Sequence, residues 1–382
     1  MNKKDIITII ITTLAIAALI AGCLYLTSRR HSDGHEKKTL GIINSQYQIY
    51  GKNIYFSHDQ ILMRFDTATD MLTKLCTDTE CDGECVLENV LYTSRIYKNR
   101  FYFSFYGNTR GFAYYDIKTG KTEIINTYDI PVFSEFFVYD GCIYHMRDNL
   151  PLEELTVYRL SVDSGKEELI INLAPDERLI MVADGMIFTS KTVVAGSNES
   201  PIRYCTVYAY DTVTLEKREI WSTDKDRYNN ISSRVQFYDG KMYFPILTYE
   251  VNKFGSLISY LCCLDTQNGE ASYISDIPIT DFYLTYEGIY LETEEVVTTL
   301  PKANQFGDTE SIAHTERNII FLEYNKNNTK TVYKNSNVIS YFGYIANRKY
   351  IGEITYSEND KRIKRFVIID LESGELKDLP IP

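Results

Sequence analysis

The sequence is poor in the residues and motifs that mark most enzyme families. It contains five histidines and one tryptophan among 382 residues. It has no Gly-x-Ser-x-Gly elbow, no His-Glu-x-x-His helix, no phosphate-cradling glycine-rich loop and no dinucleotide-binding fingerprint. These absences exclude the enzyme families that such linear motifs define. They do not exclude an enzyme whose ligands come singly from several repeats of a ring, because no linear pattern reveals such a site.

The chain also lacks a surplus of positive charge. Its formal net charge is −12, and its pI is about 5.1. No stripe of lysine and arginine interrupts this acidic balance, so the electrostatic footprint of a nucleic-acid-binding surface is missing. We therefore expect no nucleic-acid partner.

What the chain has in abundance is tyrosine, with 32 copies beside 18 phenylalanines, and aromatic residues favour strands. These residues recur in two alternating hairpin signatures. The first is clearest at Tyr139-Asp140-Gly141-Cys142-Ile143-Tyr144, and further copies lie at Tyr50, Tyr97, Asp184, Asp239, Tyr286 and Ala346. The second is clearest at Tyr115-Asp116-Ile117-Lys118-Thr119-Gly120-Lys121, and further copies lie at Asp66, Ser161, Asp211, Asp265, Asn325 and Asp370.

Seven copies of each signature alternate along the chain, and successive copies of the second lie 45 to 60 residues apart. This period is typical of four-stranded propeller blades. Asp-Gly pairs predict two-residue hairpin turns, because such turns need positive φ at both positions. The sequence therefore predicts an all-β, seven-bladed β-propeller of four-stranded antiparallel blades over residues 41–382. No strand is left over for exchange between the first and last blades.

The predicted strand order divides the connections between two faces. The tight A-B and C-D turns lie on one face, and the variable B-C and D-A connections lie on the other. The longest insertion runs from Glu294 to Glu316 in blade six, and it is expected to add surface without adding ladder hydrogen bonds. Loops on a rigid scaffold commonly carry binding function, so this loop is our candidate binding element. His145, near a strand end, is expected at the rim.

The N-terminus predicts attachment to a membrane. No charged residue occurs from Ile6 to Leu26, a length sufficient to cross a bilayer as a helix. Residues 1–27 form either a transmembrane anchor or a lipoprotein signal, with Cys23 as the candidate lipidation site in a lipobox-like sequence. Residues 28–40 form a polar tether. We expect the propeller to lie outside the cytoplasm at the cell membrane.

A cysteine cluster in the connection between blades one and two admits three interpretations. Two of Cys76, Cys81 and Cys85 could form a disulfide that stiffens the excursion. The thiolates could instead bind a soft metal ion, although a fourth ligand is not identified. The third interpretation is a calcium loop, in which the first, third, fifth, sixth and twelfth positions are Asp78, Glu80, Asp82, Gly83 and Asn89.

A family resemblance rests on three features of the sequence. These are the Asp-Gly turn motifs at Asp140, Asp184 and Asp239, the Thr-Gly-Lys motif after Tyr115, and the uncharged N-terminal span. The chain resembles membrane-attached, extracytoplasmic propellers of unknown function from Gram-positive bacteria, which are similar in style to low-density-lipoprotein-receptor-related propellers. The resemblance implies a Cys-x-x-x-x-Cys-x-His loop. Cys76 and Cys81 match its cysteines, but Gly83 stands in place of its histidine.

Two functions follow from these observations. The first is a protein- or glycan-binding scaffold module that uses the face with the long connections. The alternative is a lactonase-like or lyase-like propeller enzyme with a metal ion at the channel mouth. The sequence indicates no other cofactor.

Overall fold

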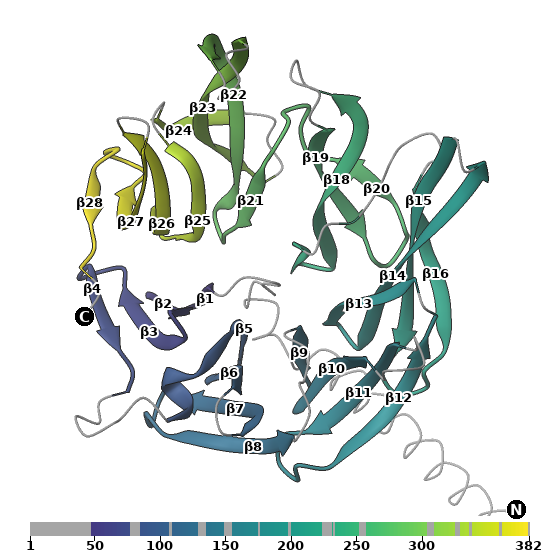
Figure 1. Ribbon diagram of the computed structural model, residues 1–382. Helices are drawn as coiled ribbons and strands as arrows, with labels where there is room; N and C mark the ends of the chain where they lie inside the picture. The colour runs from purple at the N-terminus through teal and green to yellow at the C-terminus, as the bar shows by residue number, and fades with distance from the viewer. Residues whose placement is uncertain are drawn as a thin grey trace, which may run out of the picture. The chain divides into compact units, whose positions relative to one another are not determined.

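The computed structural model describes residues 47–76, 85–106, 109–128, 135–148, 155–174, 176–197, 200–223, 231, 234–251, 257–303, 309–324, 329–335, 338–358 and 361–380. In these ranges the strands form seven four-stranded sheets, each built from four consecutive antiparallel strands. Figure 1 shows these sheets as the seven blades of a ring. The predicted fold class and blade number are confirmed.

Blades one to four contain the first sixteen strands and a 3-10 helix, η2 (Val86–Glu88). Blade one is β1 (Tyr47–Tyr50), β2 (Asn53–His58), β3 (Ile61–Asp66) and β4 (Met71–Lys74). Blade two is β5 (Val90–Tyr97), β6 (Arg100–Tyr106), β7 (Arg110–Asp116) and β8 (Thr122–Tyr128). Blade three is β9 (Phe136–Tyr139), β10 (Cys142–Asp148), β11 (Leu155–Ser161) and β12 (Glu167–Leu173). Blade four is β13 (Glu177–Ala183), β14 (Met186–Ser197), β15 (Ser200–Asp211) and β16 (Lys217–Ser222).

The last three blades complete the ring. Blade five is β17 (Gln236–Tyr238), β18 (Lys241–Val251), β19 (Leu257–Asp265) and β20 (Ala271–Tyr273). Blade six is β21 (Asp281–Leu284), β22 (Gly288–Ala303), β23 (Thr309–Glu323) and β24 (Thr329–Asn335). Blade seven is β25 (Val338–Ala346), β26 (Lys349–Glu358), β27 (Lys361–Asp370) and β28 (Leu376–Asp378).

The hairpin turns have the backbone geometry that the Asp-Gly pairs predict. Asp140 and Gly141 have φ of 44° and 73°, and Asp239 and Gly240 have φ of 50° and 74°. Positive φ at both central positions gives a turn whose twist matches that of the flanking strands. In the C-D turn of blade two, Asp116 Oδ1 accepts hydrogen bonds from the amides of residues 118 and 119. These local hydrogen bonds explain why the signatures punctuate the chain so regularly.

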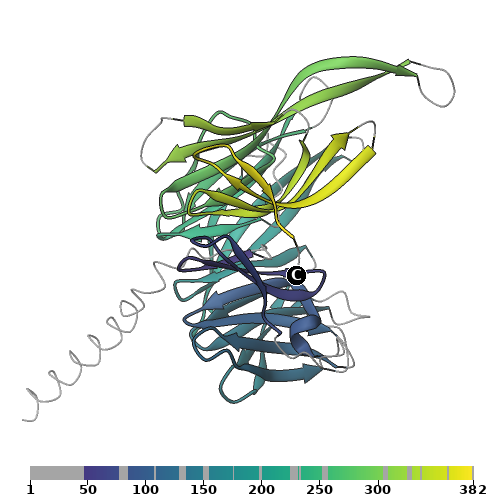
Figure 2. The same cartoon turned by 90° about the vertical axis from the view of Figure 1, so that its left-hand side faces the viewer.

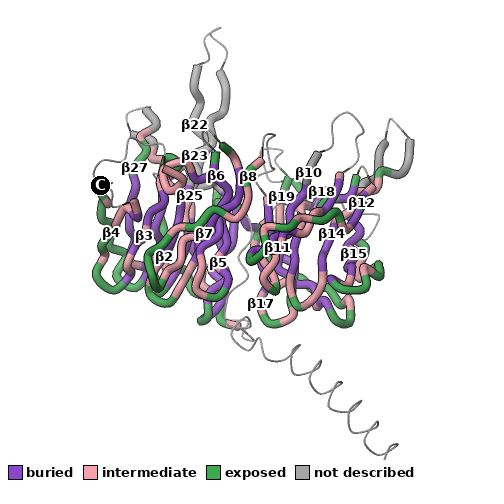
Figure 3. Tube along the Cα trace, turned by 90° about the horizontal axis from the view of Figure 1, so that it is seen from below, coloured by how far each residue is buried: buried purple, intermediate pink, exposed green. Residues whose placement is uncertain are grey.

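The middle strands of each blade are buried because neighbouring blades cover both faces of the sheet. Strand β6 contributes Phe101, Phe103 and Phe105, which are at most 2% exposed. Figure 3 shows buried strands in the interior and exposed turns along one rim. The aromatic residues therefore form the interfaces between blades, where their large apolar area supplies most of the stabilisation.

Polar side chains tie the inner edge of one blade to its neighbour. The amide of Gln236 in β17 donates to the carbonyl oxygen of Phe282 at 3.2 Å and accepts from the amide of Leu284 at 3.0 Å. Gln48 in β1 similarly accepts from the amide of Ile96 in β5 at 3.1 Å. These glutamines satisfy backbone groups on inner strands that have a ladder partner on one side only.

The ring closes by packing of blade one against blade seven. Tyr47 Oη donates to the carbonyl oxygen of Phe342 at 3.2 Å, and Lys349 Nζ donates to that of Thr67 at 3.0 Å. The rings of Phe56 and Phe366 stack with centroids 5.5 Å apart. Because each of the two sheets is made of its own four described strands, side chains hold this seam.

Candidate functional site

The face that carries the B-C and D-A connections is the more elaborate one. We call it the long-connection face. Strands β22 and β23 have 16 and 15 residues, whereas β2 and β3 of blade one have six each. Figure 2 shows the hairpin of β22 and β23 projecting beyond the strands of its own blade. The structure therefore places the longest hairpin where the sequence placed the longest insertion.

The insertion of blade six is a strand pair, which corrects our expectation for residues 294–316. The ladder of β22 and β23 runs from Gly288↔Glu323 to Ala303↔Thr309, with one register shift between Val296 and Thr298. The insertion thus adds ladder pairs to blade six. The β-branched run at residues 296–299 was the signal for a strand, because such residues favour a pleated backbone.

Beyond its base, this hairpin is a two-stranded ribbon. Strand β24 pairs with β23 only as far as Arg317↔Asn335, and β21 pairs with β22 only as far as Asp281↔Glu292. We call residues 294–303 and 309–316 the blade-six ribbon. Among the described residues, no third strand extends along it. Its outer edges therefore present backbone N–H and C=O groups that the blade itself does not pair.

A buried ion pair holds the base of the ribbon. Arg317 Nη1 lies 2.8 Å from Glu292 Oε1, and these side chains are 14% and 4% exposed. Tyr283 Oη donates to Glu292 Oε2 at 3.2 Å, and Arg317 Nη2 lies 3.5 Å from Glu294 Oε2. Burial raises the pKa of Glu292, and the Arg317 guanidinium opposes that rise. Sequence analysis missed this pair, since the two residues are far apart in the chain.

A second buried carboxylate, Glu177, begins the inner strand of blade four and is 1% exposed. Its Oε1 accepts hydrogen bonds from Thr189 Oγ1 at 2.5 Å and Tyr210 Oη at 2.8 Å, and Lys217 Nζ lies 2.9 Å from Oε2. Burial raises the pKa of Glu177, but the hydrogen bonds from Thr189, Lys217 and Tyr210 outweigh it and hold the pKa below its ordinary value. The charged form of Glu177 is thus part of the folded blade.

Replacing Glu177 with glutamine is expected to lower the free energy of unfolding at neutral pH by about 1–3 kcal/mol, because charge-assisted hydrogen bonds are lost. The folded-state pKa is depressed, so this stabilisation is present above the ordinary value of 4.5 and is lost as pH falls through the folded-state pKa. Urea unfolding from pH 7 to pH 3 should show the difference between wild type and variant shrinking with acidity. A constant difference would contradict the assignment, and exposed Glu219→Gln serves as the control.

His145 departs from its predicted place at the rim. It is fully buried within β10, and its Nε2 lies 2.9 Å from Glu167 Oε1. Tyr128 of the neighbouring blade donates to the same oxygen at 2.5 Å. The strand continues to Asp148, so His145 lies well inside the ladder. This group joins blades two and three.

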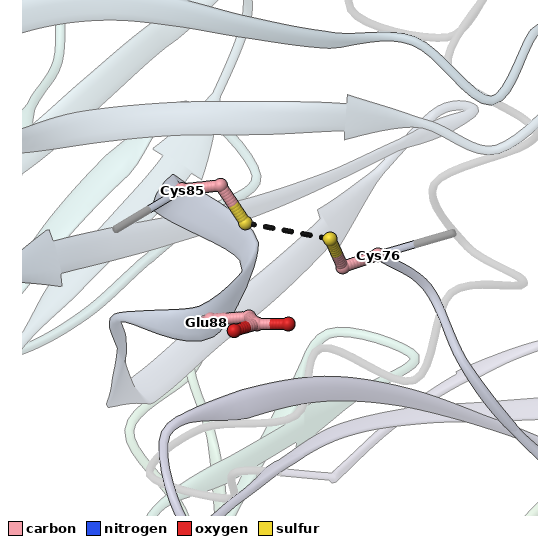
Figure 4. Close-up of side chains that lie close together, drawn as sticks. All are labelled: Cys76, Cys85 and Glu88. Carbon is pink, nitrogen blue, oxygen red and sulfur yellow. Dashed lines mark hydrogen bonds between the residues drawn. The ribbon is translucent and has the colours of Figure 1, made fainter. Parts of the chain in front are cut away.

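Two of the predicted cysteines lie together between blades one and two. The Sγ atoms of Cys76 and Cys85 are 3.5 Å apart, and Figure 4 shows Glu88 beside them on η2. Ligand atoms of all three residues lie within 4.8 Å of one another. In the described ranges this is the one group of three or more His, Cys, Asp or Glu side chains placed closely enough to hold a metal ion. Asn89 Nδ2 donates to the carbonyl oxygen of Cys85 at 3.0 Å.

The rest of this cluster lies outside the described residues, so the disulfide and calcium interpretations stay predictions. This applies to Cys81, Asp78, Glu80, Asp82 and Gly83.

The N-terminal features also lie outside the described residues. These are the uncharged span, Cys23 and the tether over residues 28–40. In the ranges that the structure does describe, no helix is both long and apolar enough to cross a bilayer.

Comparison with known proteins supports the fold and says little about activity. No protein-family model and no curated protein matches this chain. The β-propeller domain of the Trilobed protease from Pyrococcus furiosus, described as having an open velcro topology, matches with a TM-score of 0.54. That match has 11% identity and covers 90% of this chain and 99% of the other.

Two further solved structures are similar at lower TM-scores. The acylaminoacyl peptidase of Pyrococcus horikoshii has a TM-score of 0.46 and 14% identity, with 79% of this chain covered; the chain spans only 48% of that protein. Polysaccharide lyase Uly1 has a TM-score of 0.45 and 10% identity, with 86% and 90% covered. The match to the Trilobed protease domain, at 11% identity, shows the fold alone. The chain is a seven-bladed β-propeller with a long ribbon on one face.

Proposed function

We propose that this protein is a membrane-attached, extracytoplasmic binding module that holds a partner on its long-connection face. The blade-six ribbon is the observation that carries the proposal. An isolated two-stranded ribbon is at best marginally stable in water, so extending one beyond a blade contributes little to the fold. Such a ribbon is suited to contact with another molecule.

The open edges of the ribbon favour a protein partner over a glycan. An extended peptide adds to an open strand edge through main-chain hydrogen bonds, and side chains of the ribbon then confer specificity. Exposed apolar side chains on the B-C hairpins of blades four and five lie on the same face. Val194 of blade four is 61% exposed, and Val251 and Leu257 of blade five are 55% and 44% exposed. A protein of modest interface area fits this combination.

Attachment to the membrane and display outside the cytoplasm rest on sequence features. The uncharged span from Ile6 to Leu26 and the lipobox-like site at Cys23 support them.

A membrane-impermeant crosslinker applied to intact cells tests the location and the ribbon together. We expect the full-length chain to capture a protein partner. A variant with a short Gly-Ser turn in place of residues 297–312 should lose at least tenfold in captured partner. Its folded propeller should remain, because the deletion removes two-stranded ladder only and loop-closure cost changes by about 0.6 kcal/mol per doubling of length.

The control is Val213→Asp, which changes an 84% exposed side chain in a C-D turn on the opposite face. It should capture the partner as wild type does. An uncrosslinked wild-type chain would contradict display outside the cell. If the ribbon variant captured as much partner as wild type, the ribbon would have no role in binding. If a competing glycan abolished capture, the partner would be a glycan and not a protein.

A further inference from the structure

In the connection between blades one and two, the two described cysteines lie close together at the two ends of residues 77–84. We call these two ends the neck of the connection. Cys76 follows β4, Cys85 precedes η2, and residues 77–84 join them. The 3.5 Å separation of the two Sγ atoms is far from the disulfide bond length of about 2.05 Å. Two thiolates bound to one tetrahedral zinc ion at about 2.3 Å each are separated by about 3.8 Å. The observed separation is close to that of two ligands of one metal ion, and it is also the length of the hydrogen bond that the Cys85 thiol donates to Cys76 Sγ.

Glu88 ends the short helix η2 that begins just after Cys85, and its carboxylate is the third candidate ligand. A 3-10 helix has about three residues per turn, so side chains three residues apart lie above one another. The Glu88 amide donates to the carbonyl oxygen of Cys85 at 3.0 Å, which closes this turn. The carboxylate thus lies beside the sulfur atoms (Figure 4).

The packed core holds both sides of the neck in place. The amide of Leu75, next to Cys76, donates to the carbonyl oxygen of Leu62 at 3.0 Å, and Leu75 is 8% exposed. After η2, the amide of Val90 donates to the carbonyl oxygen of Gln60 at 2.8 Å, and Val90 is 1% exposed. The three ligands are therefore positioned by the fold of blades one and two, which reduces the ordering cost of binding.

The charge around the cluster suits a divalent cation. Two thiolates and one carboxylate carry three negative charges, so a divalent ion leaves one negative charge over. Lys74 forms an ion pair with Glu88, and its ammonium group offsets that charge. Thiolates select soft ions such as zinc over calcium or magnesium, which prefer oxygen ligands.

We propose that Cys76, Cys85 and Glu88 bind a zinc-class metal ion, which clips the neck of the connection between blades one and two. Among the described residues these three supply the ligands, and a tetrahedral zinc ion takes one ligand more. The clip restrains the connection on the long-connection face.

Metal content and cobalt spectra of the full-length chain, purified under reducing conditions without chelator, test this site. We expect about one zinc ion per chain. Cobalt replacement should give a thiolate-to-cobalt charge-transfer band and the intense visible bands of tetrahedral coordination. Cys76→Ser and Cys85→Ser should each abolish the charge-transfer band or halve it, and Glu88→Gln should weaken metal affinity at least tenfold.

The matched control is Cys142→Ser, because Cys142 is a half-buried cysteine in blade three and far from the cluster in sequence. It should keep the metal and the spectrum. A second measurement uses only the wild-type chain and so does not depend on whether the variants fold. Cys76 and Cys85 should be alkylated at least tenfold faster after a chelator removes the metal ion. A Cys76–Cys85 disulfide in the non-reduced peptide, or cobalt spectra without a thiolate band, would overturn the proposal.

Discussion

Replacing Arg317 with leucine is expected to lower the free energy of unfolding at pH 7 by about 3–5 kcal/mol, because it leaves the Glu292 carboxylate buried without its cation. Glu292 is 4% exposed at its side chain, and only the hydroxyl groups of Thr280 and Tyr283 would remain among its described side-chain donors. Its pKa should rise further in the variant. A raised folded-state pKa means that stability falls as pH rises, so the deficit of the variant should be smaller near pH 4.

Two further variants separate the ion pair from simple loss of side-chain packing. The double variant Glu292→Leu, Arg317→Leu removes both charges and should recover most of the lost stability. Arg365→Leu should cost less than about 1 kcal/mol, because Arg365 and Asp378 are largely exposed and 3.7 Å apart. Chemical unfolding from pH 4 to pH 8 provides the measurement. If the double variant were as unstable as Arg317→Leu, the buried charge would not be the cause.

Replacing Phe56 with alanine is expected to lower the free energy of unfolding by about 3–5 kcal/mol and to open the seam of the ring locally. Phe56 is fully buried and stacks on Tyr47 at 5.0 Å and on Phe366 of blade seven at 5.5 Å. Since no described strand crosses between blades one and seven, side-chain packing carries this junction. Hydrogen exchange should therefore accelerate selectively in β1 and β25.

Phe103→Ala is the matched comparison. Phe103 is also fully buried in the second strand of its blade, but it packs at the interface of blades one and two, which the chain itself connects. We expect a similar global loss of stability without accelerated exchange at β1 and β25. Equal exchange patterns in the two variants would show that the seam is no weaker than the other blade interfaces.

The repeat, the turns and the blade number were predictable because their causes are local. Asp140 with Gly141, and Asp239 with Gly240, adopt positive φ for reasons internal to each dipeptide. Each blade consists of four consecutive strands, so the linear period of the signatures counts the blades directly.

The ribbon was harder to predict. A loop and a continued strand pair have similar composition, and the distinction depends on whether the two arms meet in register. The pairing from Thr298↔His314 to Ala303↔Thr309 decides it. The β-branched residues near Val296 were a signal for a strand, but they did not indicate which segment would pair with them.

By itself, the sequence determined the all-β class, the seven blades, the hairpin turns and the face on which chain length varies, because short-range propensity and a repeated period encode them. The tertiary structure alone decided which polar groups meet. It brings Arg317 onto Glu292, Tyr128 of one blade onto Glu167 of the next, and Cys85 to within 3.5 Å of Cys76. These contacts join strands or loop ends that are separated in the chain. Arg317 and Glu292 meet through the pairing of β22 with β23 inside blade six, whereas Tyr128 and Glu167 meet only because two blades pack together. No periodicity in the sequence records that packing.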